Sequence, residues 1–444
     1  MAAVIPTVSA ADSVSFNLCH IVPYYLRGIF TKNKFWTSFW NTIHRDPLAV
    51  NFIRRLRQKY KSDYFYIYLL RNKSLIVLDL EGIKRVLDHS PMLYAADPDL
   101  KRRGMSHFQP NALTISRGAE WEDRRQFNEA VLATSQRVHP QADQFLRAID
   151  QATELLTANI GQCLGWDQID HLFKRITLEI IFGHDARDDT ALTDRLTAMM
   201  RESNRVFLLG KSKEFDVFYE RIRHYLESSE TGSLASMCKH APSTAQTKVE
   251  NQIPHWMFAM METLATNTMR ALALIVSHPN VEDGVRQEIQ EHGAQTPKGV
   301  DSLSYLEGCI QEAMRLWPTT PMVTRQTVQD DVLGGNAIPS GTQIVILNGF
   351  NHRDWEIDPD TVNFRPEFWI NKSFDYRFNH FSNGTQVCAG KNLALFIAKA
   401  VIAGLLVRGR YLLRRPKLNS GKPLPFQYDD FATRFEYFPP FHTP

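Results

Sequence analysis

The chain has 444 residues, of which 43% are hydrophobic and 22% charged, so it contains enough apolar sequence for a large buried core. Its formal net charge of only +3 provides no field that would favour a nucleic-acid partner. The five cysteines are odd in number and form no C-x-x-C pair, which argues against a disulfide framework or a zinc site.

The N-terminal region, residues 1–30, lacks a basic start followed by an apolar core, so we expect no signal peptide. It also lacks the run of roughly 18 apolar residues that a membrane span needs. We therefore expect a cytoplasmic protein without a transmembrane anchor. Peripheral membrane contact would fall on four apolar or aromatic residues, Tyr24, Tyr25, Leu26 and Phe30.

Two β-rich runs, residues 63–70 and 74–80, predict a hairpin because a short polar turn separates them. Most of the following sequence has helical apolar spacing. We expect helices over residues 121–132, 140–160, 167–181, 253–278, 304–317 and 392–406, and two within 191–227. Short strands are expected at residues 322–327 and 342–347 and in the C-terminal tail, and a loop at 228–251.

These elements predict an α-dominated α+β fold, a single large helical domain with a small β-rich side. No long flexible linker divides the chain, so we expect one domain over residues 1–444. Within it we expect a β-rich N-terminal subregion at about residues 40–90 and a helical body at about 91–444.

Residues 381–390, FSNGTQVCAG, place Cys388 in a loop that leads into an apolar, helix-forming segment. A helix N-terminus offers a positive dipole and free N–H groups, which lower the pKa of a cysteine. Gly384 and Gly390 would let the backbone approach a flat partner closely, and Phe381 can pack against that partner. The arrangement suits a thiolate that ligates a metal from one side, as in thiolate-bound haem iron. The alternative interpretation is a structural cysteine in a tight turn.

The pattern F-x-x-G-x-x-x-C-x-G in this loop resembles the haem-binding loop of the cytochrome P-450 family of haem-thiolate monooxygenases. The resemblance covers about residues 63–435 and implies the cytochrome P-450 fold of a soluble, bacterial-type member. It also implies haem b, iron protoporphyrin IX, as the cofactor, with Cys388 as the axial ligand of the iron.

Glu312 and Arg315 are three residues apart in the helix expected at residues 304–317, so they share one face. Taken alone, such a pair is usually a solvated surface pair of little energetic value. Here it resembles the E-x-x-R motif of the family, a buried ion pair that braces the cysteine loop. The family's third partner comes from an F-x-P-E-R-F segment, in which this chain has Phe368 at the arginine position. The brace is therefore either incomplete or completed by Arg365.

Residues 259–263, AMMET, resemble the oxygen-activation motif A-G-x-[D/E]-T of the family, with Met260 in place of the glycine. A threonine hydroxyl can bond the carbonyl four residues back, here that of Ala259, and loosen the helix. The resemblance implies catalytic roles for Thr263, which would hydrogen-bond oxygen, and Glu262, which would relay protons. Met260 would narrow the oxygen groove or contact substrate. The alternative is an ordinary threonine bonded to its own helix backbone.

Trp121 and Arg125 lie four residues apart on one helix face and resemble the W-x-x-x-R pair that binds a haem propionate. Both side chains are hydrogen-bond donors only, which suits a carboxylate. Arg325 matches the position of a second propionate-binding arginine, and Gln386 replaces the arginine or histidine usual before the cysteine. The alternative for each is an amphipathic surface residue.

The segments expected around the substrate are mainly apolar, which predicts a hydrophobic organic small molecule. The pocket residues we expect are Ala259, Met260, Met322 and Val323, within a wider set at residues 105–115, 191–227, 259–263 and 321–323 and near Phe431.

The family reaction, as implied by the resemblance, inserts one oxygen atom of O2 into the substrate. Electrons would come from a ferredoxin or flavodoxin-type donor and its NAD(P)H reductase, and the protein would be a monomer. A docking surface for the donor would form if a set of basic residues surrounded Cys388, namely Arg124, Lys391, Arg408, Arg410, Arg414 and Arg415. The alternatives are a haem-thiolate enzyme that uses peroxide or catalyses oxidative coupling or rearrangement, and a non-catalytic haem sensor.

Overall fold

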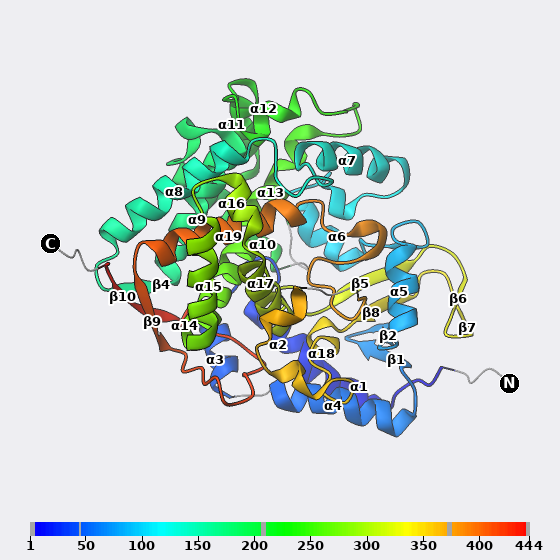
Figure 1. The fold of residues 1–444 in the computed structure, drawn as a ribbon. Helices are drawn as coiled ribbons and strands as arrows, with labels where there is room; N and C mark the ends of the chain where they lie inside the picture. The colour runs from blue at the N-terminus through cyan, green and yellow to red at the C-terminus, as the bar shows by residue number, and fades with distance from the viewer. Residues whose placement is uncertain (1–4, 44–45, 206–209, 371–374, 441–444) are drawn as a thin grey trace.

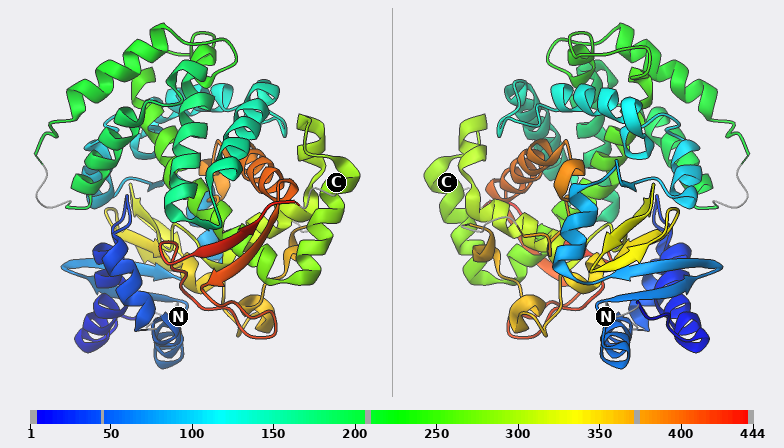
Figure 2. Two further views of the ribbon diagram at one scale, coloured as in Figure 1. Left: turned by 90° about the vertical axis from the view of Figure 1, so that its left-hand side faces the viewer. Right: turned by 90° about the vertical axis from the view of Figure 1, so that its right-hand side faces the viewer.

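The computed structural model describes residues 5–43, 46–205, 210–370 and 375–440 of the chain. Figure 1 shows a helical body with a β-sheet on either side, β9 and β10 at the left and β1, β2, β5 and β8 at the right. The first sheet faces the viewer in the left panel of Figure 2 and the second in the right panel. The expected α-dominated α+β class is therefore confirmed.

The larger sheet has five strands in the order β1-β2-β8-β5-β3. The predicted hairpin is confirmed, since β1 (Tyr64–Leu69) pairs antiparallel with β2 (Asn72–Val77). β2 then pairs parallel with β8 (Gln343–Ile346), so strands far apart in the sequence share one sheet. β8 pairs antiparallel with β5 (Val323–Thr327), and β5 with β3 (Tyr94–Ala95).

Short helices of the N-terminal region precede this sheet in the chain. They are α1 (Ala10–Phe16), η1 (Asn17–Ile21), α2 (Val22–Arg27), α3 (Lys34–Thr42) and α4 (Asp46–Tyr60). Residues of α1, η1 and α4 share a hydrophobic core with the sheet. Among the residues that the structure describes, no helix has both the length and the apolar character that a membrane span requires.

The helical body follows the sheet and agrees closely with the predicted segments. Its α-helices are α5 (Leu80–Asp88), α6 (Asp99–Ser106), α7 (Gly118–Val131), α8 (Ala142–Asn159), α9 (Trp166–Phe182), α10 (Thr190–Ser203), α11 (Phe215–Glu227), α15 (Pro279–His292), α16 (Pro297–Ser302), α17 (Ser304–Leu316), α18 (Asn348–Asn351) and α19 (Lys391–Val407). Short 3₁₀ turns connect them at η2 (Leu113–Ile115), η3 (His184–Ala186), η6 (Pro359–Val362), η7 (Pro366–Trp369) and η8 (Gly384–Gln386). The segment expected as a loop at residues 228–251 also contains α12 (Leu234–Cys238) and η4 (Val249–Asn251).

The long helix expected at residues 253–278 is divided into three parts. α13 (Ile253–Phe258) and α14 (Ala265–Ser277) flank a π-helical turn, η5 (Ala259–Leu264). Every residue from Ala265 to Val276 is buried, as predicted for a helix apolar around most of its surface. The π turn widens the helix at the motif that the sequence singled out, and such turns often occur at functional sites.

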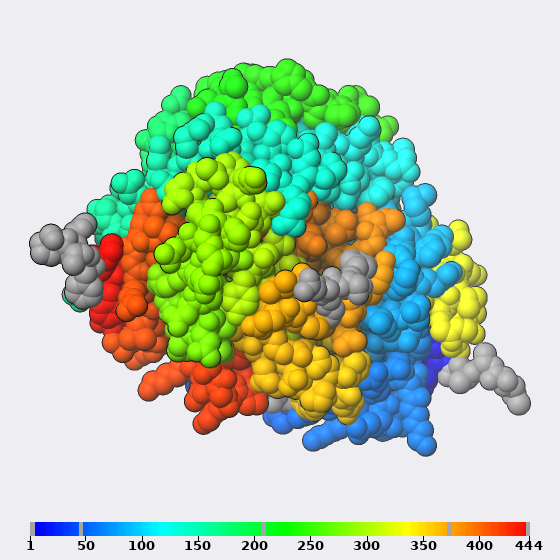
Figure 3. Space-filling model, in the orientation of Figure 1, coloured from blue at the N-terminus to red at the C-terminus, as the bar shows by residue number. Residues whose placement is uncertain are grey.

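The chain ends in the smaller sheet, in which β10 (Arg434–Phe438) pairs with β9 (Arg410–Arg415) and β4 (Cys163–Gly165). A separate two-stranded hairpin is formed by β6 (Asp331–Leu333) and β7 (Asn336–Ile338). On the face shown in Figure 3, the orange segment with the cysteine loop and α19 is partly covered by its cyan, lime and amber neighbours.

Candidate active site

The cysteine loop is closed by backbone hydrogen bonds on both sides of Cys388. The Cys388 N–H donates to the Phe381 carbonyl at 2.9 Å, and the Lys391 N–H donates to the Cys388 carbonyl at 3.3 Å. α7 supports the same loop, since Arg125 Nη1 donates to the Val387 carbonyl at 2.7 Å. The cysteine is thus fixed directly before the N-terminus of α19, as the sequence predicts.

Packing against α5 requires a glycine at position 384. It has a φ of +65°, and a Cβ placed on it would lie 2.3 Å from the Leu87 carbonyl oxygen. A Cβ on Gly390 would meet only Leu132 Cδ1, at 3.8 Å. Gly384 therefore lies close to the backbone of a neighbouring helix, and its approach to a flat ligand stays a prediction.

The predicted direction of the Cys388 pKa is wrong. Burial raises the pKa of the thiol, although the Gly390 N–H and the charges of Arg125 and Lys391 lower it in part. The side chain is nevertheless exposed, so a thiol that solvent can reach is surrounded by protein atoms. A bound cation would supply the charge that favours its thiolate form.

Glu312 and Arg315 form the buried ion pair that their spacing and the resemblance predict. Both side chains are at most 1% exposed, and the guanidinium donates to both carboxylate oxygens, at 2.6 and 2.7 Å. The same guanidinium donates to the carbonyls of His352 and Thr361, each at 2.7 Å, and of Asn363 at 3.1 Å. The pair therefore connects α17 to the segment that precedes η7.

The third partner of this brace is Trp369, which the sequence analysis missed. Its indole N–H donates to Glu312 Oε2 at 2.8 Å, and the backbone N–H of Arg365 donates to Oε1 at 3.0 Å. The Arg365 side chain instead pairs with Asp358 at 2.8 Å. Arg365 thus contributes only its backbone, and an indole donor next to Phe368 takes the place of the expected arginine. The signal in the sequence was the tryptophan that directly follows Phe368.

Trp369→Phe should lower the free energy of unfolding by about 1–3 kcal/mol, because a buried carboxylate oxygen loses a donor. Urea unfolding of the haem-loaded protein measures this difference. Trp36→Phe, in the aromatic surface cluster of α3, is the matched control. Equal unfolding free energies for the two variants would show that Trp369 is not part of the brace.

His352 connects the Glu312–Arg315 pair to the segment before the cysteine loop by hydrogen bonds. Its Nδ1 lies 3.2 Å from the Arg315 carbonyl, and the Asn379 N–H donates to its Nε2 at 2.9 Å. Burial and the Arg315 charge lower the pKa of His352 to about 3, so the ring is neutral. The Asn383 amide in turn donates to Asn379 Oδ1 at 2.6 Å, within the start of the cysteine loop.

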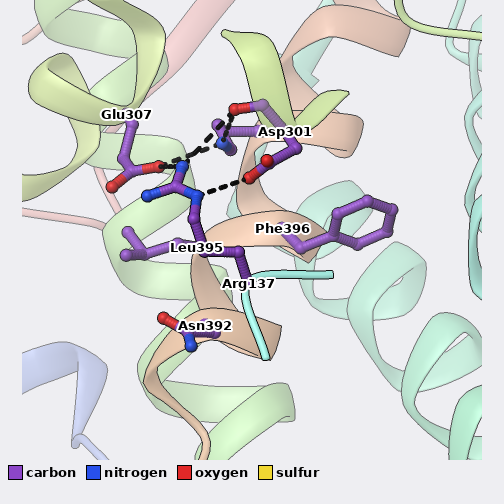
Figure 4. A pocket seen from close by; sticks show the side chains of 7 residues that line it. Arg137, Asp301, Glu307, Asn392, Leu395 and Phe396 are labelled. Carbon is purple, nitrogen blue, oxygen red and sulfur yellow. Dashed lines mark hydrogen bonds and ion pairs between the residues drawn. The ribbon is translucent and has the colours of Figure 1, made fainter. Parts of the chain in front are cut away.

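A second ion cluster holds α19 against neighbouring helices (Figure 4). Lys399 is 2% exposed and donates to Glu307 at 3.0 Å, while Arg137 contacts Asp301 at 2.9 Å and Glu307 at 3.2 Å. The cluster joins α19 to α16 and α17. It explains how a lysine can lie within an otherwise apolar helix.

The basic residues proposed as a docking surface do not surround Cys388. Arg124 is buried and donates to Ser116 Oγ at 2.7 Å. Arg408 and the arginines of β9 follow the C-terminal end of α19, whereas Cys388 precedes its N-terminal end. Of that set, only Lys391 lies beside the cysteine loop.

The oxygen-side motif lies on the π turn η5, which contacts α19 and α9. Thr263 is partly exposed, and among the described residues its hydroxyl has no bond to the Ala259 carbonyl, contrary to the prediction. The π turn alone opens the helix there. Met260 is buried in the core at 8% exposure, whereas Ala259 and Thr263 retain partial exposure.

Glu262 has a perturbed acidity. Burial, together with the Asp170 charge, raises the pKa of its carboxyl to about 7. The charges of Lys32 and Lys174 and a hydrogen bond from Thr31 act in the opposite direction. A carboxyl that titrates near neutral pH can both accept and donate a proton under physiological conditions.

Two cations without a carboxylate ion pair among the described residues, the buried Arg325 and the half-buried Lys101, fit the propionates of a haem. Arg325 is 6% exposed and donates to Ser90 Oγ at 3.0 Å and to the Thr324 carbonyl at 2.9 Å; burial lowers its pKa to about 10. Lys101, which the sequence analysis missed, donates to the Ala96 and Thr114 carbonyls. Burial and the Arg325 charge lower the Lys101 pKa to about 7.

Two other predicted propionate contacts have free hydrogen-bonding groups. Trp121 is partly exposed, and its indole N–H has no partner among the described residues. The buried Gln386 Oε1 also has no partner in that part of the chain, but an amide oxygen accepts hydrogen bonds and adds no donor for a carboxylate. Arg125 is engaged by Glu129 at 2.6 Å as well as by the loop carbonyl. Together with the accessible, desolvated thiol, this donor set fits a haem.

The expected pocket segments lie on different elements. Val323 is buried at the start of β5 and Met322 precedes it. Phe108 packs its ring 6.2 Å from that of Phe258, one residue before η5. Phe431 stacks edge-on against Trp166 of α9 at 5.5 Å. The contacts of these residues with a substrate remain a prediction.

The model of the family described as Cytochrome P450 matches residues 233–413, which include η5, the Glu312–Arg315 pair and Cys388. Human aromatase is 34% identical over 164 residues, 36% of this chain and 32% of aromatase. A putative cytochrome P450 136 of Mycobacterium tuberculosis is 29% identical over 275 residues, 55% of this chain and 56% of that protein. The match to cytochrome P450 4c3 of Drosophila melanogaster spans 31% of that protein, so this chain aligns with about a third to a half of the curated relatives named here.

A solved structure described as retinoic acid bound cyanobacterial CYP120A1 has the same fold. Its TM-score to this chain is 0.72 at 17% identity, and the match covers 88% of this chain and 94% of that one. Fold, family model and relatives agree on the cytochrome P450 family, whose model matches residues 233–413 of this chain. The match to this family implies a haem cofactor.

Proposed function

We propose that the chain is a haem-thiolate monooxygenase that uses O2 to oxidise a hydrophobic organic small molecule, by hydroxylation or a similar insertion. The observation that carries this proposal is Cys388, an accessible but desolvated thiol on a loop that a buried ion pair braces. We further propose that residues 1–444 form one catalytic domain.

Cys388 would hold the haem iron, and Arg325, Lys101, Trp121 and Arg125 would hold the propionates. The bound haem supplies the oxygen chemistry, favoured by electron donation from the thiolate. The chain itself supplies the brace that fixes the thiol, an apolar surrounding for substrate and the side chains that handle protons.

Glu262 and Thr263 supply the proton-handling groups on the oxygen side. The Glu262 carboxyl has a pKa of about 7, so both of its protonation states are populated at neutral pH. The Thr263 hydroxyl lies in the π turn and is free of helix-backbone bonds among the described residues, so it can donate to a ligand. This pair favours oxygen activation over a non-catalytic haem sensor.

Thr263→Ala should leave haem binding intact and divert roughly tenfold more electrons to hydrogen peroxide, since the proton donor is lost. Peroxide released per NADPH consumed, with a ferredoxin and its reductase as surrogate donors, measures this. Thr268→Ala is the control, because Thr268 is buried on the following helix and its hydroxyl is unpartnered. Unchanged peroxide release in Thr263→Ala would remove Thr263 from the oxygen side.

We propose a ferredoxin or flavodoxin-type donor with its NAD(P)H reductase, a monomeric state and a cytoplasmic location. Because most of the predicted basic set lies away from the cysteine loop, we propose that Lys391 and the exposed Arg137, which also pairs with Asp301 and Glu307, steer an acidic donor there. Arg137 is 61% exposed on its side chain, so its interaction with a donor would weaken as salt rises.

A further inference from the structure

The N-terminal loop, defined here as residues 28–32, has a conformation that only glycine allows at its first position. Gly28 has a φ of +92°, and a Cβ there would lie 2.2 Å from the Thr31 carbonyl oxygen. The Asn33 N–H donates to the Arg27 carbonyl at 2.6 Å and closes the turn. The loop is therefore a tightly specified turn that joins α2 to α3.

Asn204, at the end of α10, binds this loop although the two lie 173 to 175 positions apart in the sequence. Asn204 Oδ1 accepts the N–H groups of Ile29 and Phe30, at 2.8 and 2.9 Å, and Asn204 Nδ2 donates to the Thr31 carbonyl at 2.9 Å. Asn204 thus uses both ends of its amide on three successive residues. Such a complete clamp fixes where the loop presents its side chains.

The loop inserts an aromatic side chain next to η5. Phe30 is 6% exposed, and its ring packs 5.7 Å from Phe108, which packs 6.2 Å from Phe258. Phe258 directly precedes the π turn. The loop therefore reaches the oxygen-side segment of the proposed active site, although it belongs to the N-terminal region.

The next two residues of the loop contact charged groups. Thr31 is 8% exposed and its hydroxyl donates to Glu262 Oε1 at 3.1 Å. Lys32 pairs with Asp430 at 2.8 Å, and Asp430 is also held by Arg270 of α14 at 2.8 Å. The loop thus joins α10, η5 and the C-terminal segment, three of the regions expected around the substrate.

We propose that the N-terminal loop is part of the oxygen side of the active site, and that Thr31 is the positioning residue that holds the Glu262 carboxyl. The inference rests on the proposed function, in which Glu262 handles protons. Thr31 acts through Glu262, and we propose no contact of Thr31 with substrate or cofactor.

The groups that act on Glu262 come from two sides. Asp170 and Lys174 lie on α9, and Lys32 lies on the N-terminal loop. Arg270 of α14 faces Asp430, and Lys399 of α19 faces Glu307, so these cations are engaged elsewhere. Thr31 donates to the carboxylate form, so its hydrogen bond lowers the pKa that burial raises. Removing the hydroxyl should therefore raise the Glu262 pKa further.

Infrared pH titration of the haem-loaded protein tests this without a substrate or a redox partner. The carbonyl stretch of protonated Glu262 is the band lost in Glu262→Gln. We expect its midpoint near pH 7 in the unmodified protein. In Thr31→Val the midpoint should rise by roughly half a unit to one unit, about a three- to tenfold gain in proton affinity, while Thr31→Ser should restore it.

Two further variants distinguish a positioning role of Thr31 at Glu262 from a general loss of packing. Asn204→Ala should raise the midpoint in the same direction, because the clamp on the loop is lost. Thr37→Val should leave it unchanged, since Thr37 is a buried threonine of α3 whose hydroxyl has no partner. An unchanged midpoint in Thr31→Val, in protein that keeps its thiolate-haem spectrum, would overturn the role of Thr31 and leave the proposed function intact. Loss of that spectrum in the unmodified protein would instead overturn the proposed function.

Discussion

Cys388→Ala is expected to abolish the strongly red-shifted Soret band that a thiolate-bound haem gives when reduced and exposed to carbon monoxide. The thiol belongs to an exposed residue, on a loop held by hydrogen bonds to the Phe381 carbonyl and from Arg125. Alanine removes the axial ligand but leaves the backbone hydrogen bonds of the loop in place. The expected loss is therefore complete and not partial.

The control for this variant is Cys163→Ala. Cys163 is an exposed cysteine on β4, in the smaller sheet, and its loss should leave the band unchanged. Equal haem content in both variants would exclude misfolding as the cause. A persistent red-shifted band in Cys388→Ala would mean that another residue ligates the iron.

Arg315→Met is expected to lower the free energy of unfolding by about 3–5 kcal/mol, because it leaves the Glu312 carboxylate buried without its cation. The guanidinium also satisfies three backbone carbonyls, of His352, Thr361 and Asn363. Arg315→Lys should recover little, since an ammonium group cannot reproduce the planar fork. Denaturant unfolding and haem retention measure the effect.

Arg414→Met is the matched control for this second prediction. Arg414 pairs with Glu436 across β9 and β10, and its side chain is 57% exposed. Such an exposed pair contributes about 0–1 kcal/mol, so the control should remain close to the unmodified protein. If Arg315→Met lowered the free energy of unfolding as little as the control does, the Glu312–Arg315 pair would not be a brace of the fold.

The sequence predicted those features that depend on residues close together in the chain. The hairpin of β1 and β2, the limits of α8 and the shared face of Glu312 and Arg315 all follow from local periodicity or spacing. The position of Cys388 before α19 was predictable for the same reason. These features need no knowledge of how distant segments pack.

Features that depend on tertiary packing were missed or given the wrong cause. The indole of Trp369 reaches Glu312 only because η7 folds back onto α17. The helix dipole argument predicted a lowered pKa for Cys388, whereas burial, which only the fold determines, raises it. The bond between Thr31 and Glu262 joins residues 231 positions apart, and no local pattern indicates it.

The most direct test of the central claim is the carbon monoxide difference spectrum of the reduced, purified protein. We predict a strongly red-shifted Soret band, because we propose the Cys388 thiolate as the haem ligand. Correctly folded, haem-loaded protein that shows no such band would contradict thiolate ligation and with it the proposed monooxygenase function.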